Sequence, residues 1–246
     1  MSNSVLRALE ILELLSKADR PMALTPIAEQ LGIPKSTAHT ILRALVSREF
    51  LVVSEHASYS IGLKAFEIGA AHLRSVSALD IVTPQLVELT HALGVTSHYA
   101  ILDATDAVYL VKEDPPGLGI KLASSVGARL PAHVTAVGKA SLAWLPEDEI
   151  AGHLPADVGT GPGSQLLDGF AEQLAKVRQQ GFSVDDGDTA AGVRCIAAPV
   201  FNPAGPPGAI GVSYLLGSPL ELDAAAAQVV QAAERSTAQL GKRTSR

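Results

Sequence analysis

Two short helical patterns separated by a tight turn constrain the fold of this chain more than any other feature. The first, "PIAEQLG", follows Thr25, a favourable N-cap residue, and ends at Gly32. The second covers residues 33–49 and reads "IPKSTAHTILRALVSRE". Its apolar residues recur at helical spacing and are predicted to face a core: Ala38, Ile41, Leu42 and Leu45. Two helices of this length, joined by Gly-Ile-Pro, have the proportions of a helix-turn-helix motif.

The segments on either side complete a winged helix-turn-helix order. The N-terminal segment "SVLRALEILELL" is an amphipathic helix pattern with Ser4 as its expected cap. Its predicted buried stripe consists of Leu6, Leu9, Ile11, Leu12 and Leu15. After residue 49, "FLVVS" and "SYSIG" alternate about the loop "EHA", as in a small β-hairpin. We therefore expect a winged helix-turn-helix domain over residues 1–62.

The polar face of the second helix is predicted to bind double-stranded DNA. It carries two cations, an imidazole and several hydroxyls, and no acid precedes Glu49: the residues are Lys35, Ser36, Thr37, His39, Thr40 and Arg43. A recognition helix lies in the major groove, where Arg43 suits a guanine edge and Lys35 a phosphate. The alternative is an ordinary solvated helix face, which any one of these residues would fit. The capped helix, turn and hairpin together favour DNA.

Composition sets the size and environment of the protein. The chain has 246 residues, 47% of them hydrophobic, which is enough for two modest cores or one large one. No apolar run reaches the roughly 20 residues of a membrane helix, and the charged N-terminal pattern is not that of a signal peptide. The single cysteine, Cys195, excludes an intrachain disulfide and fits a reducing cytoplasm.

Charge is distributed unevenly along the chain. The net charge is −6, so bulk charge does not point to nucleic acid. Residues 1–68 hold seven cations and seven anions and are neutral, which leaves the whole −6 on the rest of the chain. This asymmetry favours two functional halves.

The remainder of the chain reads as a linker helix and a second domain. Few helix-breaking residues interrupt residues 63–78, which are the predicted linker helix. A second domain is expected over residues 79–246, with its first helix over 80–91. Strands are expected at 95–102, 107–113, 120–125, 193–201 and 209–216. Helices are expected at about 135–145, 146–153, 164–180 and 220–240. This order indicates an α+β domain around an antiparallel sheet.

The stretch "RLPAHVTAVGKA" is the best candidate for a ligand site in that domain. Thr135 is a favourable N-cap, so the amides of Ala136, Val137 and Gly138 are expected to be free at a helix start, where they attract an anion. Gly138 would leave room for a close approach. The alternative is that water or Thr135 alone satisfies these amides.

Several motifs resemble the IclR family of bacterial transcriptional regulators. They are "LTPIAEQLGIPKSTAHTILRALVSREFL", "YSIGLKAFEIG", "LPAHVTAVGKASLA" and "DDGDTAAGVRCIAAPVFNPAG", in this order over nearly the whole chain. The resemblance implies a DNA-binding first domain, a GAF-like second domain that binds a small carboxylate effector, and no cofactor. It places effector contacts at Leu130, Ala136, Val137, Asp185, Cys195 and Ser213.

Oligomerisation is expected because one recognition helix reads only a few base pairs. A homodimer on a near-palindromic operator follows, with the N-terminal helix and the linker helix as its contact surfaces. The family resemblance adds a dimer of dimers.

One position departs from the family pattern. In "AIGVSY" the family often has a hydroxyl residue two positions before Ser213, where this chain has Gly211. The prediction is a pocket that loses a donor and gains space, which favours a larger or aromatic acid.

An enzyme is the alternative class of function. Cys195, His133 and Asp185 could serve a small-molecule hydrolase as nucleophile, base and orienting group. However, "RCIAAPV" reads as a buried strand, in which a lone cysteine usually packs. A metal sensor needs clustered ligands, which the seven histidines do not form in sequence. We therefore expect a regulator without catalytic or metal-binding residues.

Overall fold

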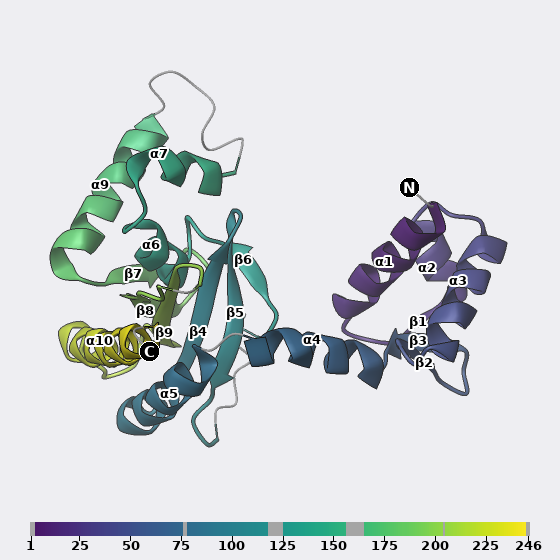
Figure 1. Ribbon diagram of the computed structural model, residues 1–246, viewed down its shortest axis with the longest axis horizontal. Coiled ribbons are helices and arrows are strands. Elements are labelled where there is room, and N and C mark those ends of the chain that lie inside the picture. Colours follow the sequence, from purple (N-terminus) through teal and green to yellow (C-terminus); the bar gives the residue numbers. More distant parts are fainter. Residues whose placement is uncertain (1–2, 76–77, 118–124, 156–164, 204, 245–246) are drawn as a thin grey trace. The chain divides into compact units, whose positions relative to one another are not determined.

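The computed structural model describes residues 3–75, 78–117, 125–155, 165–203 and 205–244 (Figure 1). The chain divides into two compact units, residues 1–75 and 76–246. Each unit has its own core and is described by itself below.

The first unit is a winged helix-turn-helix. Its helices are α1 (Asn3–Ser16), α2 (Leu24–Gln30), α3 (Lys35–Ser47) and α4 (Leu63–Ser75). Its strands are β1 (Met22–Ala23), β2 (Leu51–Val53) and β3 (Ser58–Ile61), in the antiparallel order β1-β3-β2. The helix-turn-helix and the hairpin were both predicted from the sequence, and the structure confirms them.

The core of this unit orients the helix-turn-helix pair. Ala38 and Leu42 of α3 are fully buried, and Ile27 of α2 and Ile11 of α1 are buried with them. Tyr59 of β3 closes the same cluster from the sheet. The apolar face of α3 is therefore fixed inward, which leaves its polar face outward.

Helix starts in this unit differ from the sequence prediction. Ser4 lies inside α1, and Thr25 lies inside α2, whose N-cap is Ala23 with no side-chain cap bond. The short strand β1 explains the second error, because Met22 pairs with Tyr59 and the helix begins directly after the strand. The second helical pattern was predicted from residue 33, whereas α3 begins at Lys35 with Pro34 as its N-cap.

The predicted buried stripe of α1 is only partly correct. Ile11 and Leu15 are buried, whereas Leu6 and Leu9 are 45% and 51% exposed. The outward apolar residues of α1 therefore remain available for another contact.

The second unit is built on a six-stranded antiparallel sheet. In the order β6-β5-β4-β9-β8-β7, it comprises β4 (Thr96–Asp103), β5 (Asp106–Glu113), β6 (Arg129–Pro131), β7 (Ser183–Asp186), β8 (Val193–Val200) and β9 (Gly208–Leu215). Strands β6 and β7 were not predicted. Of the strand predicted at 120–125, residues 120–124 lie outside the described residues, and Ser125 is in no strand.

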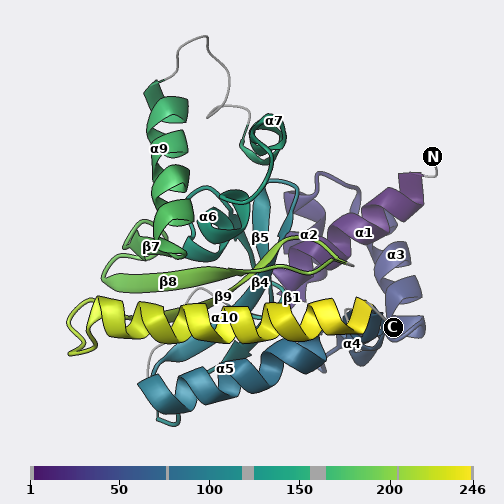
Figure 2. The same cartoon turned by 60° about the vertical axis from the view of Figure 1, so that its left-hand side comes forward.

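Helices cover both faces of this sheet. Helices α5 (Leu79–Leu93) and α10 (Leu222–Thr244) lie side by side on one face (Figure 2). The other face carries α6 (Ala136–Leu142), which also packs against α9 (Gln165–Gln180). The short helices α7 (Glu147–Ile150) and η1 (Ala151–His153) lie between α6 and α9 in the chain. None of the described helices is long and apolar enough to cross a membrane.

Helix α6 is seated on the backbone that precedes it. A Cβ atom added at Gly138 would lie 2.1 Å from the carbonyl oxygen of Ala132 and 2.4 Å from its Cα. Backbone atoms cannot give way as a flexible side chain does, so only glycine permits this contact. The prediction that Gly138 makes room for a ligand is wrong, because the backbone of Ala132 occupies that room.

We expect Gly138→Ala to destabilise the second unit by about 3 kcal/mol, the upper part of the usual range for overpacking. Gly169→Ala is the matched control, because Gly169 lies in α9 and a Cβ added there would have no atom within 4 Å. The control should stabilise by about 0.5–1 kcal/mol, as alanine does in a helix. Urea unfolding followed by the fluorescence of Trp144, the only tryptophan of the chain, measures both. Equal stability of the two variants would contradict the contact.

Candidate DNA-binding helix and effector site

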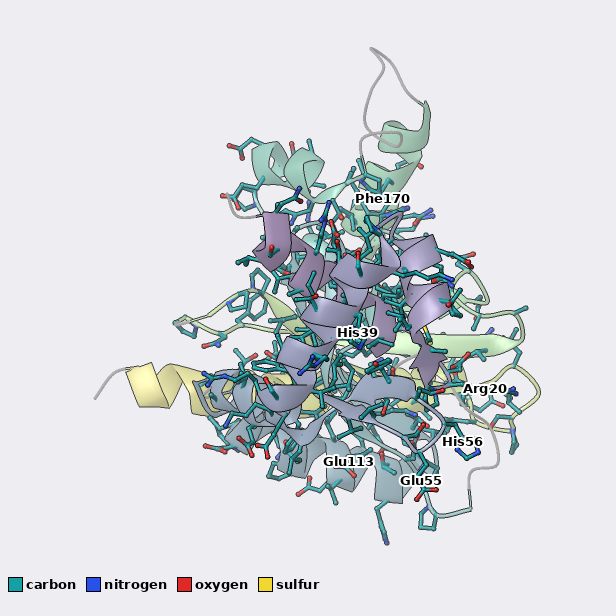
Figure 3. All side chains as sticks on the ribbon, turned by 90° about the vertical axis from the view of Figure 1, so that its right-hand side faces the viewer. Arg20, His39, Glu55, His56, Glu113 and Phe170 are labelled. Atoms are coloured by element: carbon teal, nitrogen blue, oxygen red, sulfur yellow. The ribbon has the colours of Figure 1, made fainter. Side chains whose placement is uncertain are left out.

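The outer face of α3 presents the residues predicted to contact DNA. Lys35, Ser36, His39, Thr40 and Arg43 are exposed, and Thr37 is half-buried. Figure 3 labels His39 on this helix, together with Glu55 and His56 at the turn of the β2–β3 hairpin. The six residues therefore lie on one element, on the side away from the core.

The charges on this face are available to a partner. Among the described residues, neither Lys35 nor Arg43 forms an ion pair or side-chain hydrogen bond. The hydroxyl of Thr40 donates to the carbonyl of Ser36 at 3.0 Å, so its acceptor capacity remains open. A shallow hollow on the same face is lined by His39, Thr40, Arg43, Ala44 and Ser47. Two unpaired cations beside hydroxyls match the chemistry of a phosphate backbone.

In the second unit, the polar residues predicted to contact the effector lie in one row across the sheet. Asp185 of β7 pairs with Cys195 of β8, which pairs with Ser213 of β9, which pairs with Thr96 of β4. Directly opposite residues of antiparallel strands point to the same face. The next row on that face runs Ser183, Ala197, Gly211, His98 and Lys112.

Hydrogen bonds fix the side chains of the first row. The Cys195 sulfur lies 3.1 Å from the Ser213 hydroxyl oxygen. Asp185 is buried, and its Oδ1 accepts from the amides of Asp188 and Thr189 at 2.8 and 3.3 Å. The Asp185 carboxylate therefore holds the turn after β7.

The start of α6 lies over this face and is capped as predicted. The Thr135 hydroxyl oxygen accepts from the amide of Gly138 at 3.1 Å. The amide of Gly138 is thus occupied, contrary to the expectation that it is free. Within the described residues, the amides of Ala136 and Val137 have no hydrogen-bond acceptor. The Ser183 hydroxyl donates to the carbonyl of Ala136 at 2.6 Å and ties the helix start to β7.

Leu130 approaches from the sheet edge. It lies on β6, opposite Ala107 of β5, and packs against the cluster that contains Ala136 and Val137. These contacts form an apolar wall beside the two amides.

The expectation that Gly211 opens space is wrong. A Cβ added at Gly211 would lie 2.7 Å from His98 Nε2 and 3.1 Å from a methyl carbon of Val137. The imidazole of His98, on the neighbouring strand, fills the volume that a side chain at 211 would need. Sequence reasoning missed His98 because no motif marks it. The alternation of Thr96 and His98 on one face of a buried strand is the signal that could have found it.

Lys139 is a second residue that the sequence analysis missed. Its side chain is only 7% exposed, although it is charged, and its Nζ lies 3.8 Å from a carboxylate oxygen of Asp188. This distance gives an ion pair without a hydrogen bond. The effector half therefore contains a buried cation one turn after the start of α6.

The geometry does not support a hydrolase. Burial raises the pKa of the Cys195 thiol to about 11, which keeps it protonated at neutral pH, whereas a nucleophile must be a thiolate. His133 Nδ1 is buried without a hydrogen-bond partner, and no hydrogen bond joins His133 to Cys195 among the described residues. The described residues also contain no group of three or more His, Cys, Asp or Glu side chains suited to a metal ion.

Together, the winged helix-turn-helix and the helix-covered antiparallel sheet define a two-domain DNA-binding regulator with an effector domain. Two family models match the chain, the IclR helix-turn-helix domain over residues 4–54 and the bacterial transcriptional regulator IclR C-terminal domain over residues 70–239. The chain belongs to the IclR family of transcriptional regulators. Proteins of this family are regulators and not enzymes, which removes the hydrolase alternative.

Similar proteins include regulators and solved structures. The chain is 34% identical to the HTH-type transcriptional regulator XynR of Escherichia coli K12, over 81% of this chain and 80% of that protein. The crystal structure of Thermotoga maritima IclR is 25% identical, with a TM-score of 0.78 over 98% of this chain and all of that one. An IclR homologue from Microbacterium hydrocarbonoxydans, in complex with 4-hydroxybenzoate, shares the fold at 20% identity, with a TM-score of 0.80 over 98% and 100% of the two chains.

His98 makes the second unit sensitive to acid. Burial lowers the pKa of His98 from 6.5 to about 4. As the pH falls, His98 is protonated in the unfolded chain before it is protonated in the folded one. The contribution of neutral His98 to the free energy of unfolding is therefore complete above about pH 6.5 and is lost as the pH falls toward 4. At pH 5 the loss is about 2 kcal/mol.

We expect His98→Phe to remove most of this loss. Unfolding free energies at pH 7 and pH 5, followed by Trp144 fluorescence, measure the difference. His56→Gln, on the exposed hairpin turn, is the control and should keep the parent's acid sensitivity. A parent-like loss in His98→Phe would mean that another group carries it.

Proposed function

We propose that this protein is a transcriptional regulator whose binding to operator DNA is modulated by a small organic acid, including aromatic acids. Residues 1–62 form the DNA-binding domain, 63–78 the linker helix and 79–246 the effector-binding domain. The observation that carries the proposal is the polar row of Asp185, Cys195 and Ser213 beneath the start of α6, in a chain that also carries a winged helix-turn-helix. A regulator that binds operator DNA works in the cytoplasm, which the lone cysteine also fits.

Helix α3 reads the major groove of double-stranded operator DNA in this proposal. The contacts come from its exposed face: Lys35, Ser36, Thr37, His39, Thr40 and Arg43. Support comes from the two cations without ion pairs among the described residues, since each is free to neutralise a phosphate or fork to a guanine.

Arg43→Ala should weaken operator binding by about 1–3 kcal/mol and relax the preference at one base position. Lys35→Ala should weaken binding to all sequences and flatten the salt dependence. Lys176→Ala removes an exposed cation of α9 and should leave both measurements unchanged. Fluorescence anisotropy on an operator fragment, over a range of salt concentrations, tests all three. If Arg43→Ala and Lys35→Ala both bound like the parent, the groove assignment would fail.

The effector site is proposed at the start of α6. The effector carboxylate binds the amides of Ala136 and Val137, and the other contacts come from Leu130, Asp185, Cys195, Gly211 and Ser213. Lys139, which pairs with Asp188, adds a buried positive charge one turn after the start of α6. The 4-hydroxybenzoate in the complex of the Microbacterium homologue supports a small carboxylate as the ligand class.

Loss of the Ser213 hydroxyl in Ser213→Ala should weaken effector binding by about 0.5–1.5 kcal/mol, the net value of one neutral hydrogen bond. Val137→Pro should weaken it more, because it deletes one of the two amides. A thermal-shift screen of small carboxylic acids identifies the ligand, since a ligand of the folded state raises stability. Calorimetry then compares the folded variants, and operator affinity should survive in both. Parent-like effector affinity in Val137→Pro would move the site elsewhere.

We further propose a homodimer that assembles as a dimer of dimers. Large apolar residues of α1 and α4 face solvent in the single chain: Val5, Leu6, Leu9, Leu63, Phe66 and Ile68. In this proposal the interface covers these exposed side chains of α1 and α4. The second unit exposes Trp144 and Phe201, whose rings meet edge to face at 5.4 Å, as a patch for the second contact.

Phe66→Ser tests the proposed interface on α1 and α4, and Trp144→Ser tests the proposed interface on the second unit. Each should convert a particle of four chains into one of two chains, as measured by light scattering. Only Phe66→Ser should weaken operator binding, by about 100-fold or more, because it uncouples the two recognition helices. Unchanged mass in Phe66→Ser would remove α4 from the interface.

A further inference from the structure

The position of His98 makes its imidazole part of the wall around the proposed effector site. On the sheet, His98 stands directly between Gly211 of β9 and Lys112 of β5. Its Nε2 and a methyl carbon of Val137 both lie close to the point where a side chain at 211 would begin. Gly211 and Val137 are both proposed effector contacts. A ligand that contacts Gly211 and the side chain of Val137 therefore lies beside the Nε2 edge of the imidazole.

The imidazole has unused hydrogen-bonding capacity. His98 is 1% exposed, and its Nδ1 has no hydrogen-bond partner among the described residues. Buried polar atoms in proteins are almost always paired, and an unpaired one destabilises the fold. The ring contacts Tyr109 at 5.2 Å between centroids, with the planes tilted by 57°, which fixes the ring by packing and supplies no hydrogen bond to Nδ1. Nε2, the ring atom beside Gly211, also forms no hydrogen bond among the described residues, so a ligand atom that pairs with the imidazole would gain a pre-positioned partner.

The chemistry of a neutral imidazole limits what that atom can be. One ring nitrogen donates and the other accepts, and which one does so depends on the tautomer. A hydroxyl group both donates and accepts, so it pairs with a ring nitrogen in either tautomer. A second carboxylate can only accept, and it would add a negative charge near Asp185.

We propose that His98 contacts the effector, that its imidazole pairs with a hydroxyl of the ligand, and that this contact makes the regulator select hydroxy acids over the same acids without the hydroxyl. The inference rests on the effector site proposed above. Within that site it replaces the donor that Gly211 lacks, and it assigns the hydroxyl to His98 because the imidazole has an unpaired ring nitrogen.

Matched pairs of acids test this selectivity on the full chain by calorimetry at pH 7.5. The pairs are benzoate with 4-hydroxybenzoate, benzoate with 3-hydroxybenzoate, and propionate with lactate, and pyruvate is the keto-acid probe. The parent should bind the hydroxy member of at least one pair about 3- to 10-fold more tightly, as one neutral hydrogen bond allows. It should bind that member more tightly than pyruvate.

Three variants assign the preference to the imidazole. His98→Phe should keep affinity for the plain acid and lose the preference. His98→Gln, whose amide reaches toward the position of Nε2, should recover part of it. Gly211→Ala should also reduce the preference, because the new methyl group displaces the ring of an unchanged His98. His91→Phe, at the exposed end of α5, is the control and should retain the parent's preference.

The outcomes separate this inference from the effector site itself. If plain acids or pyruvate bind as tightly as hydroxy acids, the role of His98 is overturned while the carboxylate site stands. If the preference persists in folded His98→Phe, another residue carries it and the inference is equally overturned. If none of the acids binds the parent, both the effector site and the inference fail. Circular dichroism of each variant confirms that lost binding is not lost folding.

Discussion

The contact between Gly138 and the backbone of Ala132 is the constraint on which the effector half depends. It brings α6 closer to the preceding chain than any side chain would permit. Three side-chain bonds then fix the helix start in place: the Thr135 oxygen accepts from the amide of Gly138, and the Ser183 and Ser141 hydroxyls donate to the carbonyls of Ala136 and Val137. The glycine contact and these bonds together hold the amides of Ala136 and Val137 over the sheet.

The two halves use different physical means to present their polar groups. In the first unit, burial of Ala38 and Leu42 leaves the opposite face of α3 exposed to solvent, where its cations are hydrated in the absence of a partner. In the second unit, the polar groups are themselves buried, as with Asp185 and Lys139, and each needs a partner inside the protein. An exposed polar face of this kind can bind many DNA sequences. A buried polar site is suited to distinguish small molecules that differ by one group.

Local signals explain what could be predicted from the sequence. The apolar spacing of Ala38, Ile41 and Leu42 places α3, and a threonine at the start of a helical pattern identifies the cap at Thr135, since both signals depend on residues close in the chain. Pairing between distant strands was not predictable in this way. Strand β1 and the resulting start of α2 depend on Tyr59, more than thirty residues later. The role of Gly211 depends on His98, which lies on another strand.

The shared volume of residues 98 and 211 also bears on how such a site can change over generations. Because a side chain at 211 meets the imidazole, the two positions cannot vary independently. If the side chain at 98 becomes smaller before the one at 211 becomes larger, the intermediate protein is loosely packed. In the reverse order, the two side chains of the intermediate protein clash. Related chains should therefore show covariation between these two strands, with bulk on one or the other, and a new ligand preference would arise by two ordered substitutions.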